Sequence, residues 1–184
     1  MNIILTSLDD ALTEAWKQYC GELDNVEVQT RSILKVKCDA VVSPANSFGF
    51  MDGGIDHLYT QHFGPPIQER LQTLIQDHHH GELLVGTAEI VETGNKKIPY
   101  LIAAPTMRVP MILTDTVNPY LAARATLLLV SQGTFSTNSG SCRCSIASWH
   151  STMSACPSGI GRDPHRSACR QVNPSQANAS GNRS

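Results

Sequence analysis

The sequence is poor in charge, in aromatic side chains and in long apolar runs. Charged residues make up 16% of the 184 positions and the formal net charge is −2, which excludes a general electrostatic attraction to nucleic acid or to anionic membranes. The apolar stretch at residues 121–130 is too short to span a bilayer and contains Arg124. No basic lead precedes the first apolar run, which argues against a secretory signal. We therefore expect a monomeric protein of the cytoplasm, or of the nucleus, that binds neither membrane nor nucleic acid.

Leucine, lysine and glutamate are absent after residue 130. Residues 131–184 contain a single acid, Asp163, are rich in serine and arginine, and show no sustained period of 2 or 3.6. A segment this poor in large aliphatic side chains buries too little surface to offset its chain entropy. We therefore expect a folded domain over residues 1–130 and a disordered tail over residues 131–184 that leaves the C-terminal part of the domain incomplete.

The first 130 residues alternate between strand patterns and helix patterns. Strands are expected at residues 2–6, 26–30, 39–43, 83–91 and 98–104, and helices at residues 9–19, 55–63, 66–75 and 117–130. This alternation is typical of an α/β fold with a mainly parallel sheet covered on both faces. Asp9 or Asp10 is suited to the N-terminal end of the first helix.

One loop carries most of the functional signal. Residues 44–46 follow a buried strand, and two glycines at positions 53–54 precede the next helix. In α/β sheets, ligands bind beyond the carboxyl ends of strands, and a helix N-terminus offers free N–H groups to an anion such as phosphate. Glycines let the backbone approach such a ligand closely. The alternative is a plain strand-to-helix loop, in which Asn46 and Asp56 are turn and cap residues.

The loop belongs to a longer pattern. Residues 39–46 are Asp-Ala-Val-Val-Ser-Pro-Ala-Asn, and residues 53–56 are Gly-Gly-Ile-Asp. Over residues 26–124 this pattern resembles a macro domain, the α/β module that binds ADP-ribose, whose motif is Asp-Ala-Ile-Val-Asn-Ala-Ala-Asn followed by glycines and Val-Asp. Residues 88–94 and 100–105 resemble the next two strands of that family, and residues 105–110 look like a branch-specific loop. The resemblance implies a three-layer α/β/α fold with a mixed sheet.

The resemblance also implies a function. It predicts binding of ADP-ribose or a related derivative, with hydrolysis of an ADP-ribose linkage as a further activity. Asn46 would hold the hydroxyls of the distal ribose, residues 53–55 would wrap the diphosphate with backbone N–H groups, and Asp56 would orient or activate a water at the anomeric carbon. The implied ligand contacts are Ile33, Ala45, Asn46, Gly53, Gly54, Ile55 and Asp56, with Asn46 and Asp56 as the catalytic pair. The partner would be ADP-ribose or an ADP-ribosylated protein, with no cofactor and no metal.

Several departures from the family pattern bear on this function. Ser43 and Pro44 replace the family's Asn and Ala, and Ser32 stands where many macro domains place an aspartate that contacts adenine. The family's second phosphate loop, and the strand before it, have no counterpart in residues 131–184. A reading-frame change, a retained intron or an alternative exon would each produce such a break. The alternatives are therefore a non-catalytic reader of ADP-ribosylated proteins, or an altered gene product with little ligand affinity.

Two groups of residues could suggest a metal. Adjacent histidines at positions 78–80 rarely all face one ion, so we interpret them as a solvated helix end. The cysteines at positions 142, 144, 156 and 169 lack the paired Cys-x-x-Cys spacing of zinc sites. We expect no metal site, and we expect all six cysteines to be reduced.

Overall fold

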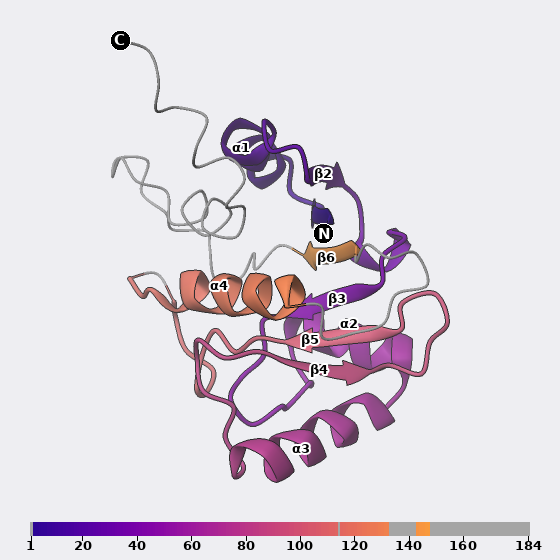
Figure 1. Cartoon of the computed structure of the whole chain (residues 1–184), viewed down its shortest axis with the longest axis vertical. Coiled ribbons are helices and arrows are strands. Elements are labelled where there is room, and N and C mark those ends of the chain that lie inside the picture. The colour runs from indigo at the N-terminus through magenta and orange to yellow at the C-terminus, as the bar shows by residue number, and fades with distance from the viewer. Residues whose placement is uncertain (1, 114, 133–142, 148–184) are drawn as a thin grey trace.

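The computed structural model describes residues 2–113, 115–132 and 143–147. Within these residues, six strands form one sheet in the order β2-β1-β6-β3-β5-β4. Figure 1 shows β6, in orange, between the N-terminal strand and β3, with β5 and β4 following on the other side of β3. The strands are β1 Asn2–Ser7, β2 Val26–Thr30, β3 Ala40–Ser43, β4 Glu89–Glu92, β5 Tyr100–Ala103 and β6 Arg143–Ala147.

The sheet is parallel except at one edge. The pairs β1–β2, β1–β6, β3–β6 and β3–β5 are parallel, whereas β4 pairs antiparallel with β5. The carboxyl ends of the parallel strands therefore lie at one edge of the sheet, where ligands bind in open α/β folds. This confirms the predicted α/β fold with a mixed, mainly parallel sheet.

Four α-helices within the described residues cover the two faces of the sheet. They are α1 Asp10–Cys20, α2 Gly54–Phe63, α3 Pro66–His79 and α4 Asn118–Ser131, and a short 3₁₀ turn, η1, spans Ile33–Lys35. Ala40 and Val42 of β3 pack in one cluster with alanines of α4, while Val41 packs with residues of α2 and α3. Because side chains alternate across a strand, Ser43 shares the face of Val41, toward α2.

Local sequence signals explain where the helices begin and end. The Asp9 side chain accepts a hydrogen bond from the backbone of Leu12 at 3.1 Å, which caps α1 as predicted. Pro66 lies at the start of α3, where its missing N–H has no helical partner to lose. The same helix ends at His79 and is followed by the capping residue His80, which adopts a left-handed φ of 53°. In the described part of the chain, no helix combines the length and the apolar character that a membrane span requires.

The structure corrects two expectations. The region after the last helix is not free of strands, because Arg143–Ala147 form β6 and pair in parallel with both β1 and β3. A strand of five residues suffices here, since it pairs with a strand on each side. The predicted strand at residues 83–91 is also too long: β4 begins only at Glu89. Residues 133–142 and 148–184 lie outside the described residues, so the predicted tail stays a prediction there.

Candidate functional site

The candidate loop continues the pairing of β3 with β5 beyond the ends of both strands. The backbone of Ala104 donates to the carbonyl of Ser43 at 3.0 Å, and that of Thr106 donates to the carbonyl of Ala45 at 3.1 Å. The Thr106 hydroxyl donates to the carbonyl of Pro44 at 3.1 Å. Residues 44–46 are therefore a built extension of the sheet at its carboxyl edge, and the loop starts from a fixed position.

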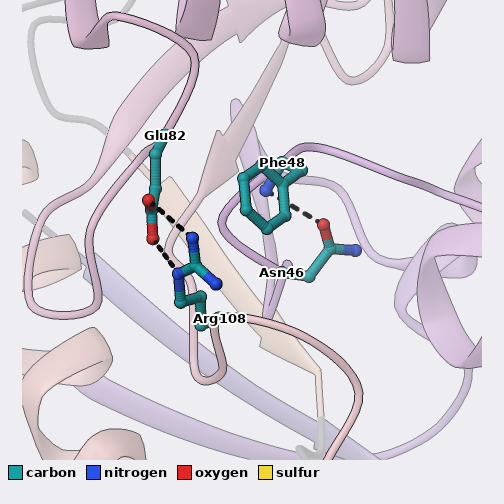
Figure 2. Close-up of polar contacts among 4 residues, drawn as sticks. All are labelled: Asn46, Phe48, Glu82 and Arg108. Carbon is teal, nitrogen blue, oxygen red and sulfur yellow. Dashed lines mark hydrogen bonds and ion pairs between the residues drawn. The ribbon is translucent and has the colours of Figure 1, made fainter.

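Asn46 shapes the first half of the loop. Its Oδ1 accepts hydrogen bonds from the backbone N–H groups of Phe48 at 3.1 Å and of Phe50 at 3.3 Å, and its Nδ2 donates to the carbonyl of Phe50 at 2.8 Å. Figure 2 shows the amide turned toward the backbone of Phe48. The Asn46 side chain therefore stabilises a turn, as expected if this is a plain strand-to-helix loop. The ribose contact implied by the family resemblance stays a prediction.

Gly53 and Gly54 leave open space at the start of α2. A Cβ built on either glycine meets no atom within 4 Å. Gly54 has a φ of 55°, a left-handed conformation that residues with a Cβ rarely adopt. No side chain in the described residues caps this end of α2, so the backbone N–H groups of its first turn are free to bind an anion. Ile55 is partly buried and packs against the hydrophobic core, so its N–H rather than its side chain is available there.

Asp56 lies in the first turn of α2 and is buried, with 7% of its surface exposed. Its Oδ1 accepts a hydrogen bond from the hydroxyl of Ser43, the last residue of β3. Burial raises the pKa of Asp56 to about 6, the Ser43 hydrogen bond lowers it in part, and the negative charge of Asp52 adds to the rise. A carboxylate with this pKa is ionised at neutral pH and can accept a proton, and its small exposed surface is where a water could reach it.

Ile33 and Ala45 do not present their side chains at the surface. Both belong to the core cluster that also contains Tyr59 of α2, with exposed fractions of 3% and 1%. Any ligand contact by these two residues would therefore come from the backbone. Ser32 is partly exposed at the start of η1, and its side chain does not cap that turn.

Two residues whose roles the sequence did not indicate, Glu82 and Arg108, lie beside the loop. Figure 2 shows the guanidinium of Arg108 paired with Glu82, through Nε–Oε1 at 2.6 Å and Nη2–Oε2 at 3.2 Å. The same guanidinium lies 5.2 Å from the centre of the Phe48 ring, a cation–π distance. The backbone of Ser47 donates to the carbonyls of Met107 and Arg108, and its carbonyl accepts from Leu83 at 2.9 Å. Arg108 lies within residues 105–110, whose resemblance to a branch-specific loop was the one signal that the sequence offered for it.

The histidines at positions 78–80 lie at the end of α3, where His78 and His80 are exposed as predicted but His79 is partly buried. His79 pairs with Glu89 of β4 at 2.8 Å. In the described part of the chain, no three His, Cys, Asp or Glu side chains gather as metal ligands would. Cys20, Cys38 and Cys144 are buried and are not part of a disulfide, and the remaining cysteines of the predicted tail lie outside the described residues.

Together, the fold and the loop define an α/β protein in which a helix start without a side-chain cap, behind two glycines, lies at the carboxyl edge of the sheet. The model of the Macro domain family matches residues 42–133, half of the chain. The chain therefore belongs to the macro domain family. The family's second phosphate loop would fall after β6, outside the described residues.

Known proteins agree with this assignment. An uncharacterized protein of Aeropyrum pernix is 32% identical over 105 residues, which cover 57% of this chain and 52% of the relative, so the chain spans about half the length of that protein. The macrodomain of Mycobacterium tuberculosis DarG superposes with a TM-score of 0.55 at 15% identity, covering 78% of this chain and 85% of that one. A mutant macrodomain of Oceanobacillus iheyensis, solved with ADPR, gives a TM-score of 0.51 at 12% identity, covering 77% of this chain and 88% of that one. At these identities, the two structures support the fold alone.

Proposed function

We propose that this protein binds ADP-ribose, with the diphosphate and the adjoining ribose at the start of α2. The observation that carries the proposal is the uncapped N-terminus of α2 behind two glycines with open space above them, inside the stretch that matches the macro domain model. A helix start of this kind binds phosphate oxygens through backbone N–H groups and the helix dipole. The mutant macrodomain of Oceanobacillus iheyensis solved with ADPR supports the choice of ligand.

Each residue of the loop has a separate role in binding the ligand. The N–H groups of Gly54 and Ile55 bind the diphosphate, and the missing side chain of Gly53 leaves room for it. Asn46 holds the loop in the shape that admits the ribose, through its three bonds to the backbone of Phe48 and Phe50. Because Ser32 is neutral, adenine is bound less tightly than by an aspartate at that position.

The finer proposal is hydrolysis of an ADP-ribose linkage. Asp56, with a pKa raised to about 6, is ionised at pH 7 yet remains basic enough to take a proton from an attacking water. Its negative charge would also stabilise positive charge that develops on the ribose ring. The substrates would be ADP-ribosylated proteins, and the protein would act as a monomer in the cytoplasm or nucleus.

Calorimetry with ADP-ribose tests the binding proposal. Since the sequence shows no second phosphate loop, we expect a Kd in the high micromolar range or weaker, a binding free energy on the order of −5 kcal/mol.

Gly53→Glu should abolish binding. The φ of −133° at this position tolerates a side chain, and the new carboxylate fills the open space and repels the diphosphate. Gly54→Glu should do the same, but it also strains the backbone. Gln61→Glu, exposed on α2, adds the same charge as a control and should leave binding unchanged. Binding unaffected by Gly53→Glu would refute the proposal.

Single-turnover assays on ADP-ribosylated protein test hydrolysis. Asp56→Ala should remove turnover and keep most of the affinity for ADP-ribose, because the N–H groups of α2 remain. A wild-type protein that binds ADP-ribose without turnover would identify a reader. An Asp56→Ala variant as active as wild type would exclude Asp56 as the base.

A further inference from the structure

The hydroxyl of Ser43 is aimed at the carboxylate of Asp56, 13 positions later in the chain. Both side chains are buried, with exposed fractions of 0% for Ser43 and 7% for Asp56. We propose that Ser43 is a positioning residue, which holds the Asp56 carboxylate in one rotamer and in its ionised form within the proposed site. This inference rests on the proposed function and adds a residue that departs from the family motif.

The fold fixes the donor. Ser43 ends β3 in register with Ala103 of β5, and its carbonyl accepts the N–H of Ala104 at 3.0 Å. The strand therefore cannot turn the Ser43 side chain away from α2. The acceptor is held less firmly. Within the described residues, the hydrogen bond that fixes the Asp56 carboxylate is the one that Oδ1 accepts from Ser43. Loss of the hydroxyl would leave the carboxylate free to rotate.

The charges around Asp56 make this single hydrogen bond important. Burial and the nearby charge of Asp52 both favour the protonated acid, and the Ser43 hydroxyl is the group that opposes them. The other titratable neighbour is Tyr59, one turn further along α2, whose own pKa is raised by burial and by Asp56. Tyr59 donates its hydroxyl to the carbonyl of Val42 at 3.0 Å, so its hydroxyl hydrogen is directed to the backbone rather than to Asp56. Within the described residues no cation takes part in these shifts, so Ser43 is the side chain that stabilises the anion, in addition to the helix start on which Asp56 lies.

The expected consequence is a shift toward the protonated acid when the donor is removed. In Ser43→Ala, the pKa of Asp56 should rise by about one unit, which lowers its ionised fraction severalfold at neutral pH. Ser43→Cys is nearly isosteric and its thiol is a weak donor, so it should shift the pKa in the same direction and serves if the alanine variant fails to fold. Ser43→Thr keeps the hydroxyl and should leave the pKa of Asp56 close to the wild-type value.

Carbon-detected NMR of the Asp56 carboxyl, titrated in the ligand-free protein, measures this directly. A rise in both Ser43→Ala and Ser43→Cys, with recovery in Ser43→Thr, supports the proposal. An unchanged pKa in a folded Ser43→Cys variant overturns it, as does an equal rise in Ser43→Thr. Where turnover is present, kcat at neutral pH should fall in step with the ionised fraction of Asp56, while the Kd for ADP-ribose stays unchanged. Because the titration needs no ligand, calorimetry can refute the proposed function while the role of Ser43 is still tested.

Discussion

Ser43 and Asp56 join the central strand β3 to the first turn of α2 through a buried hydrogen bond from hydroxyl to carboxylate. The end of β3 and the start of α2, which flank the candidate loop, are therefore linked directly by a side-chain hydrogen bond. Burial at this junction raises the pKa of Asp56 to about 6, although the hydrogen bond from Ser43 itself lowers it in part. An acid in this position destabilises the folded state at neutral pH, which is the pattern expected where function, rather than stability, selects a residue.

Asp56→Asn should stabilise the protein at neutral pH. The pKa of Asp56 rises from 3.8 to about 6 on folding, so the folded state binds more protons between these values and the free energy of unfolding falls as the pH rises through that window. The asparagine variant has no charge to bury and should gain up to about 3 kcal/mol at pH 7, and nothing near pH 3.5. Urea unfolding of both proteins at a series of pH values measures the difference.

A matched control is available in Asp52, which is exposed and raises the pKa of Asp56 by its charge. Asp52→Asn should shift the pH window of the wild-type curve slightly downward without the large gain at pH 7. A difference between wild type and Asp56→Asn that does not vary with pH would contradict the assignment of the raised pKa.

Gly54→Ala should destabilise the protein, whereas Gly53→Ala should not. Gly54 has a φ of 55° and Gly53 has a φ of −133°, while the space around both Cβ positions is open. The difference between the two variants therefore isolates backbone strain, which we expect to be about 1 kcal/mol. Chemical denaturation measures it, and equal stability of the two variants would show that the loop relaxes to another conformation.

Arg108→Ala should loosen the loop at residues 46–50 without unfolding the domain. The guanidinium links Glu82 to the ring of Phe48, next to the backbone bonds that Ser47 makes with Met107 and Leu83. Arg108→Lys keeps the charge but loses the bidentate pairing. Hydrogen exchange at the N–H groups of Phe48 and Phe50 should be fastest in the alanine variant and intermediate in the lysine variant. Unchanged exchange in both would show that Asn46 alone holds the loop.

The sequence predicted most of the central fold, because that part rests on local signals. The run Asp39-Ala-Val-Val-Ser43 is short with an apolar centre, and its last four residues form the buried strand β3. The glycines at positions 53–54 predicted the helix start, and the alternation of strands and helices predicted the parallel sheet. Boundaries were less accurate: residues 83–88 contain apolar side chains but make one isolated bridge instead of a strand.

Long-range pairing accounts for what the sequence could not show. The link from Arg108 to Glu82 spans 26 positions, and that from Ser43 to Asp56 joins two elements, so neither follows from local spacing. The residue types alone indicated that Asp56 lies in the loop region, but not that it is buried. The composition after residue 130 predicted a tail without strands, yet composition cannot detect a short strand that two neighbouring strands hold in place.

Ser145→Pro should unfold the domain, because β6 lies in the middle of the sheet. Ser145 is fully buried and is in register with Ile4 of β1 and Val41 of β3. Proline removes one ladder N–H and its ring clashes with a central strand, so we expect a loss of at least about 3 kcal/mol, a large share of the roughly 5–15 kcal/mol that stabilise a typical domain. Ser145→Ala keeps the backbone N–H and loses only a long side-chain contact to the carbonyl of Ile4 at 3.5 Å, so it should lose about 1 kcal/mol of stability or less.

Urea unfolding compares the stability of the two variants with that of the wild type. Hydrogen exchange on the wild-type chain should show strong protection at residues 41–42 and 144–146 together. Fast exchange at residues 144–146, with a Ser145→Pro variant as stable as wild type, would mean that β6 is not part of the folded sheet in solution and that the domain holds together through β3, β4 and β5 alone.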